Sequence, residues 1–247
     1  MRTLFLDIET TPHVAFIWRL FQENVGPSQL IEPSRLLCVA YAFDDEPMRF
    51  AAEWQGKQGH ASMVRNLHYA LDEADVVVHY NGTSFDEKHL NREFLQAGMR
   101  PPSPYATIDI YRTIKQRFKF ASSKLEQVAK ELEVRDGKIK VDFDLWRGVM
   151  NNSLQARGQM MEYNKEDVEL LRTLYPILRP WIKRHPNVAL YDTDGEELAC
   201  TRCASTTVQR RGYVLTAAGR FPKFQCLSCG GWSRGAKRVS TTPLREA

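Results

Sequence analysis

The chain has 247 residues, of which 43% are hydrophobic and 26% are charged, a composition that indicates a folded protein and excludes an intrinsically disordered one. It contains no apolar stretch of the roughly 20 residues that span a membrane and no N-terminal signal peptide, so we expect a cytoplasmic protein without a membrane partner. The formal net charge of +4 is unevenly distributed, because residues 199–245 contain nine basic residues and no acidic one. This asymmetry favours a polyanionic partner, most often a nucleic acid, over a solvated basic surface.

The first ten residues predict a strand with two carboxylates at its end. Leu4, Phe5 and Leu6 form an apolar run, and Asp7 and Glu9 follow it with Ile8 between them. Residues i and i+2 of a strand point to the same face, so the two carboxylates should stand side by side while Ile8 turns into the core. Like charges held that close suit a divalent cation; the alternative is a strand end whose acids face water.

The rest of the chain alternates between strand and helix patterns, and the first three strands are expected to form an antiparallel meander. After a long excursion over residues 11–34, strands are predicted over 35–43, 48–54, 75–80 and 106–111. Helices are predicted over 61–73, through 94–95, and over 122–132, the last capped by Ser122 or Ser123. A basic loop over 135–140 precedes a long helix from Leu154 or Gln159 to Lys183, which Pro176 and Pro180 end or kink.

Two further acidic positions stand out against this pattern. Asp86 ends the segment Asn-Gly-Thr-Ser-Phe-Asp, where Gly82 permits a tight turn and Thr83 and Ser84 could cap a helix. It would lie in the first turn of a helix that follows a buried strand, where open α/β sheets place functional groups. Asp167 shares the apolar stripe of the last helix with Tyr163, and a carboxylate on such a stripe needs a cation or a strong donor. A buried hydrogen-bond pair is the alternative for Asp167.

Taken together, Asp7, Glu9, Asp86 and Asp167, with Tyr163 one helical turn before the last, resemble the motifs of the DEDD (DnaQ-like) superfamily of 3′→5′ exonucleases, in its tyrosine (DEDDy) branch. The motifs Asp-Ile-Glu-Thr and Asn-Gly-x-x-Phe-Asp are similar to those of family B DNA polymerase proofreading domains. Residues 18–43 are similar to phage-encoded stand-alone members of the superfamily. The resemblance covers about residues 1–180 and implies an α/β fold with a ribonuclease H-like mixed sheet and flanking helices.

The resemblance also implies a two-metal-ion mechanism with Mg²⁺ or Mn²⁺, which hard oxygen ligands select. Asp7, Glu9 and Asp167 would hold the metal that activates the attacking water, and Asp7 would bridge to a second metal that Asp86 ligates directly or through water. Tyr163 would orient the water, because a phenol with a pKa near 10 is a poor base at neutral pH.

Substrate contacts are less constrained by the sequence. Phe16 and Trp18, with Phe21, either stack on a terminal base or pack into the protein. By resemblance, Asn81 contacts the strand near the scissile bond. Lys124, with Lys115, Arg117 and Lys119, either follows the phosphate backbone or forms a solvated face. His79 and His89 flank the second motif and are interpreted as structural, since the tyrosine branch needs no catalytic histidine.

Four of the five cysteines form two Cys-x-x-Cys pairs near the C-terminus, Cys200 with Cys203 and Cys226 with Cys229. Four thiolates in this spacing predict one closed tetrahedral Zn²⁺ site, with a disulfide as the alternative. Strands over 208–215 and 221–225 make the segment similar to a zinc ribbon over residues 199–239, after a linker over 184–198 and before a disordered tail over 240–247. About 40 residues cannot build an adequate core, so the metal would supply the folding energy. The ribbon would bind nucleic acid or dock a protein.

The sequence therefore predicts a 3′→5′ exonuclease domain over residues 1–183 that hydrolyses single-stranded nucleic acid, DNA more readily than RNA. Two alternatives stay open: a 3′→5′ exoribonuclease, because no residue pattern reads the 2′-hydroxyl, and a non-catalytic nucleic-acid-binding protein on a nuclease fold. Without an attached polymerase domain, any proofreading would act in trans with a replication or repair partner, in the host cytoplasm if the protein is phage-encoded.

Overall fold

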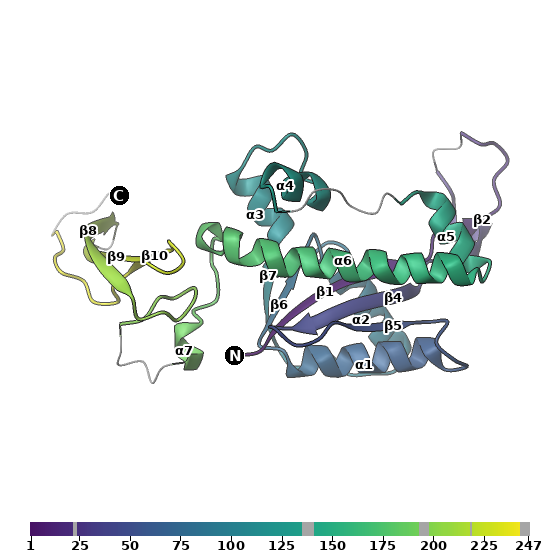
Figure 1. Cartoon of the computed structure of the whole chain (residues 1–247), viewed down its shortest axis with the longest axis horizontal. Helices are drawn as coiled ribbons and strands as arrows, with labels where there is room; N and C mark the ends of the chain where they lie inside the picture. The colour runs from purple at the N-terminus through teal and green to yellow at the C-terminus, as the bar shows by residue number, and fades with distance from the viewer. Residues whose placement is uncertain (22–23, 135–140, 193–197, 218, 243–247) are drawn as a thin grey trace.

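The computed structural model describes residues 1–21, 24–134, 141–192, 198–217 and 219–242. Its larger part is a five-stranded sheet covered by helices on both faces, and a small second sheet follows at the C-terminal end (Figure 1). Among the described helices, none combines the length and the apolar character that a membrane span requires. The predicted basic loop over 135–140 lies outside the described residues.

The main sheet has the strand order β5-β4-β1-β6-β7 and is mixed, as predicted. Its bounds are β1 Thr3–Thr10, β4 Leu36–Phe43, β5 Arg49–Ala52, β6 Val76–His79 and β7 Ala106–Asp109. The pairs β1–β4 and β4–β5 are antiparallel, which confirms the predicted meander, whereas β1–β6 and β6–β7 are parallel. Every residue of β4 and β6 is buried, because helices cover both faces of the central strands.

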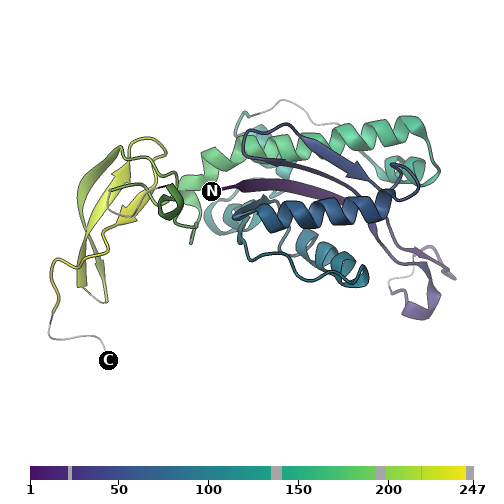
Figure 2. The same ribbon diagram turned by 90° about the horizontal axis from the view of Figure 1, so that it is seen from below.

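The alternation along β1 separates the two layers of the core. Leu4, Leu6 and Ile8 pack toward α1 (Gly59–Glu73) and α2 (Asp86–Gln96), whereas Phe5 packs toward the long helix α6 (Leu154–Leu178). Figure 2 shows α1 and α6 on opposite sides of the sheet. Since Asp7 and Glu9 have the same parity as Phe5, they point to the α6 side, and Ile8 turns into the opposite core as predicted.

Several local expectations about where elements start and end were wrong. The strand predicted over 106–111 stops at Asp109, whose carboxylate accepts from the Arg112 N–H and caps α3 (Ile110–Arg117). The N-cap residue of α4 (Leu125–Glu131) is Lys124, not Ser122 or Ser123. The N-cap residue of α2 is Phe85, because the turn before it closes through the backbone bond from Glu87 N–H to Gly82 O.

The segment before α6 contains a helix that the sequence pattern did not reveal. This helix, α5 (Phe143–Met150), packs beside the N-terminal part of α6 and is capped by Asp142. Helix α6 starts after its cap Ser153 and ends at Leu178, earlier than Lys183; Pro176 lies inside its last turn and Pro180 lies in the following 3-10 helix η2 (Arg179–Trp181). The excursion after β1 forms a two-stranded ribbon of β2 (Val14–Ala15) and β3 (Leu30–Glu32), with the short helix η1 (Pro27–Gln29).

The C-terminal module, which we define as residues 198–242, follows the short helix α7 (Ala189–Asp192). It is a three-stranded antiparallel sheet of β8 (Val208–Thr216), β9 (Gly219–Cys226) and β10 (Trp232–Arg234), and both predicted strands are confirmed. Arg202 attaches the module to the end of α6, because its guanidinium donates to the carbonyl oxygens of Arg179 and Ile182 at 2.9 and 2.5 Å. Ser240 pairs with Arg220 beside β9, and residues 243–247 lie outside the described part.

Candidate active site

Three acidic side chains meet where the end of β1 faces α6. Asp7 and Glu9 come from β1 and Asp167 from α6, and one carboxylate oxygen of each lies within 4.8 Å of the others. Asp167 is buried, with 5% of its surface exposed, and Asp7 and Glu9 are half-buried. The structure therefore brings together three of the four carboxylates that the sequence predicts as metal ligands.

Tyr163 lies one helical turn before Asp167 and belongs to the same group. Its ring meets Trp146 of α5 edge-on, with centroids 6.3 Å apart. Burial, and then the charges of Asp167, Glu9 and Asp7, raise the pKa of the Tyr163 phenol well above its usual value of 10. The pKa of the Cys38 thiol beside Glu9 is raised by burial and by the charges of Glu9 and Asp7 as well. The carboxylates thus create a negative potential at Tyr163 and Cys38, and a cation bound at such a site would be stabilised by it.

Asn164 is a site residue that the sequence reasoning missed. Its side chain is fully buried, and its Nδ2 donates to the backbone oxygen of Asp7 at 3.0 Å and to Asp7 Oδ2 at 2.8 Å. These two bonds join α6 to β1 and fix how the Asp7 carboxylate is oriented. The available signal was an amide in the stripe of α6 that also holds Met160, Asp167 and Leu171, since a buried amide needs partners.

Asp86 lies next to this group rather than in it. Strand β6 pairs with β1 only up to Phe5, so beyond that point the edge of β1 is open to the first turn of α2. There the Ile8 N–H donates to Asp86 Oδ1 at 3.2 Å, and only 3% of Asp86 is exposed. Burial raises the pKa of Asp86 to about 6, although the neighbouring His79 opposes the shift. Because burial disfavours the charged form of this carboxyl group, a nearby cation would stabilise its carboxylate.

The turn that leads into α2 is held by His79 and shaped by two residues with special backbone requirements. Asn81 adopts a left-handed conformation with φ of 66° and donates its N–H to Asp109 Oδ1 at 3.0 Å. Gly82 donates its N–H to His79 Nδ1 at 2.9 Å, and a Cβ at Gly82 would lie 2.3 Å from the His79 ring. His79 Nε2 in turn contacts Glu87 at 3.1 Å. These contacts of His79 hold the turn that carries Asn81 and leads to Asp86.

A cleft of about 1000 Å³ opens beside the carboxylates, between α6 and the segment of α3 and α4. Asp7, Tyr163 and Asp167 line one side of it. The rest is lined by residues of α3 and α4 and of the segments that follow β6, precede α4 and precede α5: Tyr80, Asn81, Tyr111, Lys115, Ser122, Ser123, Lys124, Leu125, Glu126, Val141 and Asp142. Of the predicted substrate contacts, Asn81 and Lys124 thus share one cleft with the acidic group.

The aromatic residues of the excursion lie elsewhere. Phe16, Trp18 and Phe21 have 75%, 94% and 95% of their surfaces exposed, so they do not pack into the core. The excursion projects from the end of the molecule opposite to the C-terminal module (Figure 1). Of the two alternatives drawn from the sequence, packing is therefore excluded, and base stacking by Phe16 and Trp18 stays a prediction.

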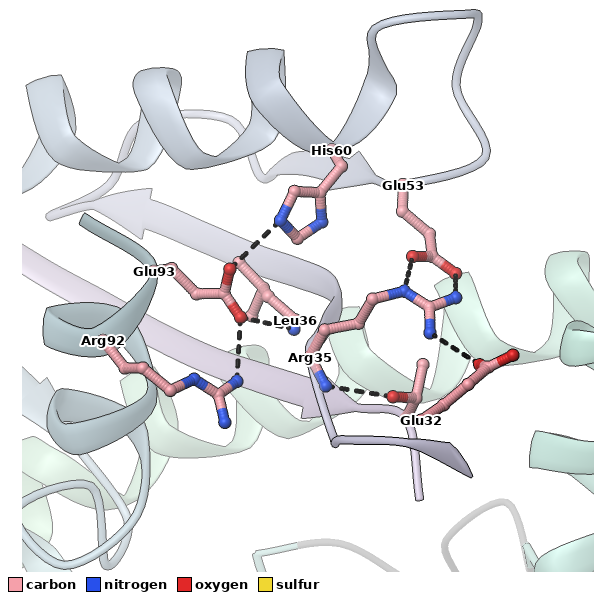
Figure 3. Close-up of polar contacts among 8 residues, drawn as sticks. Glu32, Arg35, Leu36, Glu53, His60, Arg92 and Glu93 are labelled. Atoms are coloured by element: carbon pink, nitrogen blue, oxygen red, sulfur yellow. Dashed lines mark hydrogen bonds and ion pairs between the residues drawn. The ribbon is translucent and has the colours of Figure 1, made fainter. Parts of the chain in front are cut away.

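The strand end that carries Glu9 is irregular, and a buried carboxylate holds it in place. Glu9 pairs with Cys38 but Thr10 pairs with Leu36, so β4 has one extra residue at this point, a β-bulge. The freed N–H of Leu36 donates to Glu93 Oε1 at 3.0 Å, and Glu93 also contacts His60 at 3.1 Å and Arg92 at 2.9 Å (Figure 3). Glu93 is only 5% exposed. It therefore stabilises the bulge of β4 that lies opposite Glu9 of β1.

Replacement of Glu93 by glutamine is expected to destabilise the protein by about 1–3 kcal/mol at pH 7, because charge-assisted hydrogen bonds are lost. Burial raises the pKa of Glu93, but hydrogen bonds from His60, Arg92 and Leu36 outweigh it and lower the pKa from 4.5 to about 2. The stabilisation is therefore present above pH 4.5 and disappears as the pH falls toward 2. Urea unfolding of both proteins at pH 7 and pH 3 measures this convergence. Glu162→Gln, on the exposed side of α6, serves as the control, and an equal loss there would contradict the argument.

The four predicted cysteine ligands also converge. Cys200, Cys203, Cys226 and Cys229 place their sulfur atoms within 4.8 Å of one another, with Cys203–Cys226 at 3.6 Å and Cys200–Cys229 at 3.7 Å. Disulfide sulfurs would lie about 2.05 Å apart, whereas Zn–S bonds of about 2.3 Å in a tetrahedron place the sulfurs about 3.8 Å apart. Backbone N–H groups of Arg202, Cys229 and Gly231 donate to three of these sulfurs. The cluster is therefore consistent with zinc and not with a disulfide.

Comparison with known proteins agrees with this architecture. A search of curated proteins gave no match. The family B DNA polymerase from the hyperthermophilic archaeon Pyrobaculum calidifontis is similar in structure, with a TM-score of 0.53 and 17% sequence identity over 73% of this chain; the match spans 25% of the polymerase chain. A family model described as RNase H superfamily matches residues 32–179, a range that includes Asp86, Tyr163 and Asp167. The chain therefore belongs to the RNase H superfamily.

Proposed function

We propose that this protein is a metal-dependent 3′→5′ exonuclease that hydrolyses single-stranded nucleic acid, DNA more readily than RNA. The observation that carries the proposal is the convergence of Asp7, Glu9 and Asp167 within 4.8 Å at the side of an open cleft. Two facts support nucleic acid as the substrate: the RNase H superfamily fold, and the similarity to a chain whose name is that of a DNA polymerase. The second fact favours DNA.

The donor set fits hard divalent cations. Asp7, Glu9 and Asp167 offer carboxylate oxygens close enough to share one ion, and oxygen ligands of this kind select Mg²⁺ or Mn²⁺. Asp86, held beside β1 by the Ile8 N–H, would complete a second site together with Asp7. Bound ions of this kind lower the pKa of a coordinated water and stabilise the charge that develops on the leaving oxygen.

The remaining residues of the site would bind the substrate and orient the reacting groups. Asn164 holds the Asp7 carboxylate through its Nδ2. The raised pKa keeps the phenol of Tyr163 protonated at neutral pH, so its hydroxyl would be able to donate a hydrogen bond that orients the attacking water. Asn81 and Lys124 line the cleft and would contact the substrate strand, Lys124 through its phosphates. In the C-terminal module, the four cysteines would hold one structural Zn²⁺, and the module would form a zinc ribbon over residues 199–239.

A matched degradation assay tests the proposal. Single-stranded DNA and RNA of one sequence, each labelled at the 5′ end, are incubated with Mg²⁺ or Mn²⁺ and either the wild-type protein or Asp7→Ala. Products that shorten progressively from the 3′ end with the wild type alone are expected, with DNA degraded faster. Faster degradation of RNA would make the protein an exoribonuclease. If neither substrate is degraded although binding is retained, the fold serves as a non-catalytic nucleic-acid-binding protein.

Replacement of Tyr163 by phenylalanine tests the orienting role. The loss of one donor at the reacting water is expected to lower kcat on the order of 100-fold. The affinity for Mn²⁺ and the KM should stay close to those of the wild type, because the carboxylates are intact. Steady-state kinetics and Mn²⁺ titration measure the two effects. Tyr69→Phe, which removes the same hydroxyl from an exposed tyrosine of α1, is the control. Loss of Mn²⁺ binding in Tyr163→Phe would instead make the tyrosine part of the metal site.

A further inference from the structure

The two faces of the sheet in the C-terminal module carry different side chains, and the strand register defines them. Residues that pair across antiparallel strands share a face, and neighbours along a strand alternate. The pairs Gln209–Gln225, Trp232–Gln225 and Arg234–Lys223 therefore lie on one face. Arg211 joins them, because its Nε donates to Gln225 Oε1 at 3.3 Å. We call this the Trp232 face, formed by Gln209, Arg211, Lys223, Gln225, Trp232 and Arg234.

The opposite side, which we call the Tyr213 face, carries Arg210, Tyr213 and Arg220. Here the aromatic ring is already engaged: the Arg210 and Arg220 guanidiniums lie 5.1 and 4.6 Å from the ring centroid, and Arg210 also donates to the Tyr213 hydroxyl at 2.8 Å. Because these contacts within the module already occupy the Tyr213 ring, this face is a weaker candidate for binding a ligand.

On the Trp232 face, the indole is 46% exposed, and Lys223 Nζ lies 5.0 Å from the centroid of its ring. Arg234 lies over the Phe221 ring at 4.5 Å, and Arg211 and Gln209 are exposed. The face thus combines one accessible aromatic platform with three cations and two amides. A base stacks on an indole of this kind, and cations spaced around it bind the flanking phosphates.

Charge over the whole module points to the same partner. Residues 198–242 contain eight basic side chains and no acidic one. The part of the main domain beside the module also contains basic residues: Arg117 at the end of α3 donates to the Trp181 carbonyl at 3.2 Å, and the carbonyl oxygen of Arg179 accepts from Arg202 of the module at 2.9 Å. Lys115 of the same helix α3 lines the active-site cleft. Basic residues are therefore found from the cleft along α3 to the module.

We propose that the Trp232 face binds the single-stranded substrate 5′ of the end that lies in the cleft, with Trp232 stacking on a base and Lys223, Arg234 and Arg211 contacting phosphates. This inference rests on the proposed function in naming the strand as a substrate. Neither stacking nor phosphate contact depends on the sugar, so the face should hold DNA and RNA equally.

The test uses the full chain with Asp7→Asn, so that binding is measured without cleavage. Affinity for a 5′-fluorescein-labelled 20-nucleotide DNA, and for RNA of the same sequence, is determined at several KCl concentrations. We compare Trp232→Ala, the double variant Lys223→Gln/Arg234→Gln, and the control double variant Arg210→Gln/Arg220→Gln. The control removes the same charge from the same small sheet but on the Tyr213 face. Zinc content, measured for each variant, verifies that the module is folded.

Trp232→Ala is expected to weaken binding between about 5-fold and about 100-fold on both strands. The double variant on the Trp232 face should lower the salt slope by about 1.4, since each lost contact to a single strand contributes about 0.7. The control should keep both the affinity and the slope near the parent values. Equal losses in both double variants, or unchanged binding in Trp232→Ala, would overturn the proposal; unchanged binding throughout would leave the face to a protein partner.

Steady-state cleavage kinetics distinguish a failure of this inference from a failure of the proposed function. With an otherwise wild-type chain, Trp232→Ala should raise the KM for the 20-nucleotide strand and leave hydrolysis of a trinucleotide unchanged, because a trinucleotide occupies only the cleft. If the wild type cleaves nothing but the binding pattern is as expected, the proposed function fails and the inference stands. If the wild type cleaves and the Trp232→Ala KM does not change, the inference fails and the proposed function stands.

Discussion

Asp7→Asn is expected to lower the rate of 3′ cleavage more than about 1000-fold, because the charge that holds a divalent cation is removed, and a Lewis acid contributes several kcal/mol to the transition state. The substitution is isosteric, and the new amide can still accept from Asn164 Nδ2 through its oxygen. The fold should therefore survive. The measurements are single-turnover cleavage of a 5′-labelled strand, Mn²⁺ titration and thermal unfolding.

Glu126→Gln is the matched control for Asp7→Asn. Glu126 lines the same cleft, but it is exposed on α4 and lies apart from the three converging carboxylates. Its removal changes the charge of the cleft by the same amount and should alter the rate by no more than a few-fold. A comparable loss in both variants would show that the cleft needs negative charge in general and would argue against a metal site at Asp7, Glu9 and Asp167.

Cys226→Ser is expected to abolish zinc binding and to unfold the C-terminal module without unfolding the main domain. Structural zinc contributes apparent free energies of about 10–16 kcal/mol in small cysteine-ligated modules. The three-stranded sheet here has few buried apolar side chains to replace that contribution; Phe221 is one of them. Zinc analysis should fall from one ion per chain to none, and limited proteolysis should begin within residues 198–242. The five-stranded domain should stay resistant.

Cys38→Ala controls for the loss of a cysteine as such. Cys38 is fully buried in β4, beside Glu9 and away from the four-cysteine cluster. Its replacement leaves a small cavity, so a modest loss of stability is expected, with zinc content unchanged at one per chain. Zinc loss in Cys38→Ala, or an intact protease-resistant module in Cys226→Ser, would contradict a metal-dependent fold for the module.

The sequence was most informative where local pattern and chemistry coincide. The alternation of Phe5, Asp7 and Glu9 along β1, and the helical spacing of Tyr163 and Asp167, fix which face each side chain takes before any tertiary contact is known. The two Cys-x-x-Cys pairs similarly predict a tetrahedral arrangement of four sulfur atoms, because a bound Zn²⁺ would require it. The mixed sheet follows from the order of these elements.

The missed features depend on contacts between segments far apart in the chain. Asn164 binds Asp7 across 157 positions, and Glu93 holds the Leu36 N–H across 57. A polar residue inside a helix pattern reveals that it needs a partner but not which one. Helix α5 was missed because its eight residues are too few to show a clear period, and its packing against α6 decides its conformation.

Helix α6 runs without interruption over 25 residues, about 37 Å; Asp167 lies near its middle, and the C-terminal module attaches just after its end. Asp167 and Arg179, where Arg202 attaches the module, are 12 positions apart, which corresponds to a rise of about 18 Å. At about 3.4 Å per stacked nucleotide, a strand that bridges the two spans about five nucleotides. Helix α6 therefore sets how far the attachment point of the module lies from Asp167. Under the proposal that the module binds the strand, a strand of fewer than about five nucleotides would be held by the cleft alone.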